Sequence, residues 1–277
     1  MAELLTLEVG DWSFTARAWG PSGGRVVLLL HGFPQTSTSW AAVGAQLGQR
    51  GLRAVAVDQR GYSSGARPSD VAAYRMADLV RDAMGFAQSL GGRVDVAGHD
   101  FGGIVGWQLA TRHPELVRTF IAVSTPNQLA LDHVLATVPE ERERFAYIRE
   151  FRRPGVAEAA LLDDDGRRLR ALFGDRMPSA RMDEDVAAMQ LPGALTAALN
   201  WYRAMSPDDS QGLGLVTVPT SYVWGSADIA FGRAAAELSG RYVDADYRFV
   251  PLEGASHWLP DERPELLADE ICLRALG

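Results

Sequence analysis

The stretch VDVAGHDFGGIVGWQLA, residues 94–110, constrains the fold of this chain more than any other. Its first four residues are typical of a short buried strand, and a helical pattern of apolar residues begins at Ile104. A strand that turns directly into a helix, with glycines on both sides of one polar residue, predicts a nucleophile elbow. Side chains at Gly98 or Gly102 would collide with neighbouring backbone on so sharp a turn. The residue at its centre is Asp100, where the usual motif carries serine.

Strand-like and helix-like segments alternate along most of the chain. The predicted strands are 26–30, 53–57, 94–97, 119–123, 220–225 and 247–250, and the predicted helices include one ending at residue 49, then 73–90 and 264–275. An antiparallel hairpin, 5–9 and 13–18, precedes them. Continuous apolar strands that alternate with helices are typical of a parallel sheet covered on both faces. We therefore expect an α/β fold with a mostly parallel central sheet.

The alternation stops at about Asn127. Residues 129–213 contain helical and charged stretches but no convincing strand, and the alternation resumes at Pro219. We expect a core domain formed by residues 1–127 and 214–277, with residues 128–213 inserted as an all-helical cap.

Composition and charge exclude several classes of function. A net charge of -8 disfavours nucleic acid and anionic membrane surfaces, since both require basic patches. The single cysteine, Cys272, allows no intrachain disulfide. No apolar run approaches the roughly 18 residues of a membrane span, and the N-terminus shows no signal-peptide pattern. We expect a cytoplasmic protein that needs no cofactor. We also expect no metal, because no His/Cys cluster has ligand spacing. A homodimer is a possible oligomeric state.

Residues of catalytic type follow several predicted strands. Asp100, Asp228 and His257 each lie in a loop after a strand, and the carboxyl ends of parallel strands meet at one edge of a sheet. Nucleophile, acid and histidine also follow one another in the order known from α/β-hydrolases. Structural or solvated positions are expected for the other four histidines, His31, His99, His113 and His133.

An aspartate at the elbow determines the chemistry. A carboxylate with a pKa near 4 is ionised at pH 7, so it can attack a saturated carbon without a base and form an ester. His257 would then activate the water that hydrolyses this ester, and Asp228 would fix the tautomer of the histidine. The backbone N–H groups of Phe33 and Phe101 are the expected oxyanion hole.

Each of these assignments has a plainer alternative. An aspartate in a glycine-rich turn is usually a turn former, and the flanking strand and helix are what favour a nucleophile at Asp100. Asp228 alone would serve equally as a helix cap before Phe231.

Five motifs, HGFPQ, DQRGYSSG, GHDFGG, WGSAD and GASHW, together resemble the α/β-hydrolase-fold epoxide hydrolases, which adjoin the haloalkane dehalogenases. The resemblance covers nearly the whole chain and implies the α/β-hydrolase fold and conversion of an epoxide to a diol. The segments around Tyr147 and Tyr202 are similar to those that carry the two lid tyrosines of the family. Such phenols bind the epoxide oxygen and protonate the alkoxide. Without the resemblance, both tyrosines would be interpreted as packing residues.

The residues at which this chain differs from related dehalogenases also favour an epoxide hydrolase. Similar dehalogenases place Trp after the nucleophile and often Asn in the first loop as halide donors, whereas this chain has Phe101 and Phe33. Fluoroacetate dehalogenases carry arginines just after the nucleophile, where Phe101 and Ile104 stand here. A dehalogenase remains the second hypothesis. A non-catalytic binding protein is the third, although its usual mark would be a broken triad.

The expected partner is a small epoxide. Aromatic residues near the predicted site favour an apolar or aromatic one. The predicted substrate contacts are Phe33, Trp201 and Trp258.

Overall fold

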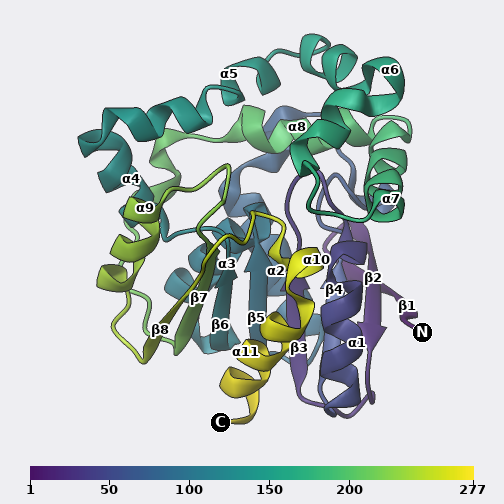
Figure 1. Cartoon of the computed structure of the whole chain (residues 1–277). Coiled ribbons are helices and arrows are strands. Elements are labelled where there is room, and N and C mark those ends of the chain that lie inside the picture. Colours follow the sequence, from purple (N-terminus) through teal and green to yellow (C-terminus); the bar gives the residue numbers. More distant parts are fainter.

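One eight-stranded sheet organises the computed structural model, which describes residues 1–277 (Figure 1). The strands are β1 (Glu3–Val9), β2 (Trp12–Trp19), β3 (Val26–Leu30), β4 (Arg53–Val57), β5 (Val94–His99), β6 (Val117–Val123), β7 (Thr220–Gly225) and β8 (Tyr247–Leu252). Their order in the sheet is β1-β2-β4-β3-β5-β6-β7-β8. β2 runs antiparallel to its neighbours, and β3 to β8 are all parallel. The expected α/β-hydrolase sheet is therefore confirmed.

Helices cover both faces of the sheet because alternate residues of each strand point to opposite sides. Leu29 packs into the core beneath α1 (Ala41–Gln49) and α11 (Pro264–Leu276). Leu28 and Leu30 pack on the other side, with α2 (Met76–Ser89) and α3 (Phe101–Arg112). Two short helices, α9 (Arg233–Leu238) and α10 (Leu259–Glu262), complete the core.

One predicted helix begins later than the sequence pattern indicates. Residues 73–90 were expected to be a single helix, but Val71–Tyr74 is a 3-10 turn and α2 starts at Met76. Arg75 between them is extended, with φ −61° and ψ 148°, which breaks the helical hydrogen bonds.

The segment between β6 and β7 contains helices and no strand, as predicted. Its helices are α4 (Gln128–Thr137), α5 (Ile148–Phe151), α6 (Val156–Phe173), α7 (Ser179–Gln190) and α8 (Ala194–Ala204). They form a layer at the top of Figure 1, over the carboxyl ends of the strands. We call residues 128–213 the cap. Leu195 and Leu199 of α8 belong to the same buried cluster as α2 and α3, so the cap packs directly on the core.

A buried polar cluster also joins the cap to the core. Gln35 donates hydrogen bonds from Nε2 to Asp185 of α7, at 3.2 Å, and to Asp261 of α10, at 2.8 Å. Arg181 of α7 lies 3.3 Å from Asp185 and 3.2 Å from Asp261. One arginine thus faces two buried carboxyl groups. None of the helices combines the length and apolar composition that a membrane span requires.

Candidate active site

Asp100 occupies the single position between β5 and α3. Its backbone has φ 52° and ψ −121°, a strained conformation for a residue with a side chain. The hydroxyl of Thr125 donates to the Asp100 carbonyl at 2.8 Å and helps to hold this turn. A Cβ at Gly98 would stand 2.2 Å from the Gly102 carbonyl oxygen, and one at Gly102 would stand 2.2 Å from that of Leu30. The predicted steric reason for the two glycines is therefore confirmed.

The Asp100 carboxylate is held between donors from two loops. Its Oδ1 accepts a hydrogen bond from the Phe33 backbone N–H at 2.9 Å, and its Oδ2 lies 3.5 Å from His257 Nε2. Burial raises the pKa of Asp100, but the contact with His257 and the Phe101 backbone N–H outweigh it, so that the pKa is lowered. The carboxylate is ionised at neutral pH, and the two predicted oxyanion donors, Phe33 and Phe101, are in place beside it.

His257 is oriented by Asp228, which lies in the loop after β7. Nδ1 of His257 is 2.9 Å from Asp228 Oδ2. The other oxygen of Asp228 accepts the backbone N–H groups of Ala230, at 2.7 Å, and Phe231, at 3.0 Å. One oxygen of Asp228 thus contacts the histidine, and the other accepts two backbone N–H groups of the loop. No helix begins at this point, since α9 starts at Arg233, so the alternative of a helix cap is wrong.

The pKa of His257 is raised to about 10. Burial lowers this pKa, but the negative charges of Asp228 and Asp100 outweigh that effect. The raised pKa favours a protonated His257 in the contact with Asp100 and Asp228.

Two other histidines support the loops around the site. Nε2 of His31 accepts the Gln59 backbone N–H at 3.1 Å, which requires this nitrogen to be unprotonated. His99 contacts the His257 carbonyl through Nε2 at 2.8 Å, and burial lowers the pKa of His99 to about 3. Both side chains are fully buried and have the structural positions expected for them.

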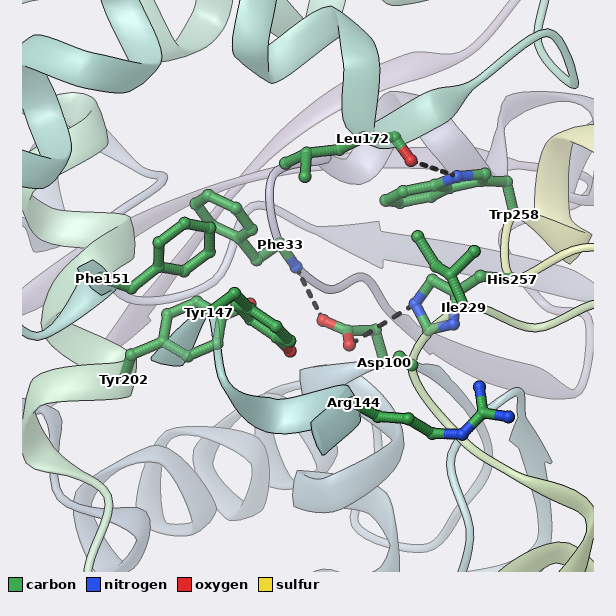
Figure 2. Close-up of a pocket in the computed structure, with 11 residues that line it drawn as sticks. Phe33, Asp100, Arg144, Tyr147, Phe151, Leu172, Tyr202, Ile229, His257 and Trp258 are labelled. Atoms are coloured by element: carbon green, nitrogen blue, oxygen red, sulfur yellow. Dashed lines mark hydrogen bonds and ion pairs between the residues drawn. The ribbon is translucent and has the colours of Figure 1, made fainter. Parts of the chain in front are cut away.

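A cavity of about 170 Å³ lies above Asp100, between the sheet and the cap (Figure 2). We call it the front cavity. It is lined by Phe33, Asp100, Arg144, Tyr147, Phe151, Leu172, Tyr202, Ile229, Ala230, His257 and Trp258. Most of this lining is apolar or aromatic. The cavity thus brings together Asp100 and His257 of the predicted triad, both predicted lid tyrosines, Phe33 and Trp258. Asp228 lies outside the lining and contacts His257 Nδ1.

Tyr147 and Tyr202 approach Asp100 from the cap. Tyr147 precedes α5 and Tyr202 lies in α8, and their ring centroids are 6.1 Å apart. Figure 2 shows both rings facing the carboxylate across the front cavity. Burial, together with the charge of Asp100, raises the pKa of each phenol. Tyr147 remains 36% exposed as a residue, so the raised pKa reflects the position of its hydroxyl inside the cavity. Both phenols are protonated at neutral pH and available as donors.

Trp201 does not line the front cavity, although the sequence pattern indicates a substrate contact. Its indole N–H donates to the Arg60 carbonyl at 2.8 Å, which turns the side chain away from the cavity. Its ring packs against Phe101 at 5.2 Å between centroids. The Phe101 side chain also lies outside the cavity lining, and the residue acts on Asp100 through its backbone N–H.

Five further residues line the cavity and were not predicted from the sequence: Arg144, Phe151, Leu172, Ile229 and Ala230. Phe151 follows Tyr147 by one helical turn, so its presence could have been inferred from that spacing. Ile229 comes directly after Asp228, which is also a recognisable signal. Leu172 and Arg144 carry no such signal. The Arg144 guanidinium donates to the Asp228 carbonyl at 3.3 Å and, in Figure 2, points away from Asp100.

No group of three or more His, Cys, Asp or Glu side chains is arranged to hold a metal ion.

The sheet order, the elbow and the alignment of Asp100, His257 and Asp228 define an α/β-hydrolase with aspartate at the nucleophile position. Comparison with known proteins agrees. The sequence pattern of the alpha/beta hydrolase family matches residues 27–270. The AB hydrolase superfamily protein YfhM of Bacillus subtilis is 34% identical over 258 residues, which cover 90% of each chain.

Proteins named as epoxide hydrolases are also similar to this chain. Epoxide hydrolase 2 of Caenorhabditis elegans is 32% identical, over 90% of this chain and 73% of its own length. The crystal structure of epoxide hydrolase A from Mycobacterium thermoresistibile superimposes with a TM-score of 0.85 at 27% identity, covering 100% of this chain and 99% of that one. The chain therefore belongs to the alpha/beta hydrolase family, in the branch of the epoxide hydrolases.

Proposed function

We propose that this chain converts an epoxide and water to a vicinal diol through an ester of Asp100. One arrangement supports the proposal above all: an ionised carboxylate faces two protonated phenols across a small apolar cavity and touches a histidine on its other side. Such a site holds a nucleophile, an acid for the leaving oxygen and a base for water in one place.

In the first step, Asp100 Oδ2 attacks one carbon of the epoxide ring. A carbon–oxygen bond forms, the ring bond from that carbon to oxygen breaks, and the alkoxide takes a proton from Tyr147 or Tyr202. Their raised pKa values keep the phenols protonated until the alkoxide, a much stronger base, develops. The product of this step is an alkyl ester of Asp100 and a tyrosinate.

In the second step, water hydrolyses this ester. Water gives a proton to His257 Nε2 while its oxygen adds to Cγ of Asp100, and the backbone N–H groups of Phe33 and Phe101 stabilise the oxyanion. The bond from Cγ to the substrate oxygen then breaks, and that oxygen takes the proton from His257. The remaining acid proton of Asp100 returns to the tyrosinate, so the enzyme is restored.

Esterification of Asp100 also changes the pKa of His257. The charge of Asp100 is one of the causes that raise the pKa of His257 to about 10. Once Asp100 is an ester, this charge is gone and the pKa of His257 falls, so the ring can release its second proton to solvent and become a neutral base. When Asp100 is a carboxylate again, His257 takes a proton back from solvent. The contact between Asp228 Oδ2 and Nδ1 orients the ring throughout.

The cavity favours an epoxide over a haloalkane. Both indole N–H groups near the site are already engaged, that of Trp201 with Arg60 and that of Trp258 with the Leu172 carbonyl at 3.2 Å. Neither is free to bind a departing halide. The apolar lining and the volume of about 170 Å³ support a compact apolar or aromatic epoxide.

A matched panel of epoxides and haloalkanes with the same carbon skeleton tests the assignment. We expect diol release from the epoxides and no chloride or bromide release from the haloalkanes. Halide release at rates comparable to diol formation would make the chain a dehalogenase.

A further inference from the structure

A second hollow reaches His257 from outside. This side cavity, of about 240 Å³, lies between the end of α6 in the cap and the loops that carry Asp228 and His257. It is lined by residues 171–176 of the cap and by Ala227, Ile229, Ser256, His257 and Trp258 of the core. Four of these residues, Leu172, Ile229, His257 and Trp258, also line the front cavity. The two cavities therefore meet at the catalytic histidine.

The residues that separate the two cavities include a hydrogen-bonded pair, Trp258 and Leu172. The indole N–H of Trp258 donates to the main-chain carbonyl of Leu172 at 3.2 Å, and the Trp258 ring packs on Phe173 at 4.6 Å between centroids. Ile229, which is 59% exposed, lines both cavities from the core side. Figure 2 shows Ile229 and Trp258 beside His257, and the Leu172 carbonyl joined to the Trp258 indole by a dashed line.

The two cavities differ in chemical character. The front cavity presents aromatic and aliphatic side chains, with Asp100, Arg144 and His257 as its only ionisable groups apart from the two phenols. The side cavity carries Asp175, Arg176 and Ser256 beside His257, and its rim residues Asp175 and Arg176 are exposed. An apolar epoxide prefers the first, and water prefers the second.

The size of the front cavity favours a second route. Its volume is about 170 Å³, so an alkyl ester on Asp100 takes up space that water would need to enter from the same side. Hydrolysis of the ester nevertheless requires a water molecule within reach of His257. We propose that the side cavity is the route by which this hydrolytic water reaches His257 while the alkyl group occupies the front cavity. The inference rests on the proposed ester mechanism.

Plugging the side cavity should separate the two chemical steps. Ala171→Trp places a large side chain at the cap rim of the side cavity, away from Asp100 and the lid tyrosines. We expect ester formation within about twofold of wild type and ester decay on the order of tenfold slower. Ala227→Leu narrows the same cavity from the core side and should give the same split. Ala159→Trp, on an exposed position of the same helix α6, is the matched control and should leave both rates unchanged.

The measurement is rapid mixing with a reactive epoxide, acid quenching, and the mass of the peptide that contains Asp100 as a function of time. Equal ester decay in wild type and in both plugged variants would overturn the route. Slower ester formation confined to long epoxides, with unchanged ester decay, would make the side cavity a substrate subsite. That result would also overturn the proposed water route. Absence of any ester in wild type and in His257→Gln would contradict the proposed function itself, and the inference with it.

Discussion

Asp100 and His257 contact each other directly, with 3.5 Å between Oδ2 and Nε2. The proposed nucleophile of the first step therefore contacts the proposed base of the second. Their charges are linked, because the Asp100 carboxylate helps to raise the pKa of His257 and His257 helps to lower that of Asp100. The pair favours an ionised nucleophile before the reaction and a basic histidine after Asp100 has been esterified.

Asp228→Asn should slow turnover mainly at ester hydrolysis. The amide oxygen can still accept the N–H groups of Ala230 and Phe231, so the loop should fold, but the charge that supports the His257 imidazolium is lost. We expect a loss on the order of 100-fold or more in kcat, with accumulated ester. Steady-state rates within about twofold of wild type, in a folded variant, would place the acid elsewhere.

The lid tyrosines should each contribute to ring opening. Tyr147→Phe and Tyr202→Phe are expected to slow ester formation on the order of 10- to 100-fold each, and the double variant should nearly abolish it. Tyr74→Phe is a suitable control, since its hydroxyl donates to the Pro68 carbonyl outside the cavity. The measurement is single-turnover ester formation. Unimpaired ester formation in the double variant would show that Tyr147 and Tyr202 do not protonate the alkoxide. A main argument against a dehalogenase would then be lost.

The polar cluster between cap and core should make stability depend on pH. Burial raises the pKa of Asp185 from 3.8 to about 7, despite the neighbouring Arg181. Between these two pH values the folded protein binds a proton that the unfolded chain has released, so the free energy of unfolding should fall as pH rises from about 4 to about 7.

Asp185→Asn should lessen this decline, while Asp183→Asn, an exposed change on the same helix, should not. Urea denaturation at several pH values across that window checks both variants. An unchanged pH dependence in Asp185→Asn would show that Asp185 is ionised throughout.

The sequence predicts the parts of this structure that depend on local chemistry. The apolar strands, the glycines of the elbow and the loop positions of Asp228 and His257 follow from residue patterns that need no long-range information. Trp201 shows the limit of such reasoning. Its aromatic character indicates a cavity residue, but the Arg60 carbonyl, 141 positions away in sequence, determines where its indole points.

Cap residues are harder still to place from sequence. Leu172 sits on an interrupted helix, because residues 163–166 of α6 depart from helical backbone angles. The break interrupts the hydrophobic periodicity of the helix, so the sequence does not show that Leu172 faces the core. The bounds of α2 differ from the prediction for a related reason, since the extended conformation of Arg75 leaves no mark in the hydrophobic pattern.

The two-step mechanism is tested most directly by His257→Gln mixed with a reactive epoxide. Asp100 needs no base to attack, whereas glutamine cannot accept the proton of the hydrolytic water, so ester formation should proceed and hydrolysis should stall. Mass spectrometry should find one added substrate mass on the peptide that contains Asp100, and none in Asp100→Asn. The wild type in oxygen-18 water should place the label on Asp100 during its first turnover, with unlabelled diol. Labelled diol in that first turnover, with no adduct in His257→Gln, would mean that water attacks the epoxide directly and that Asp100 is not the nucleophile.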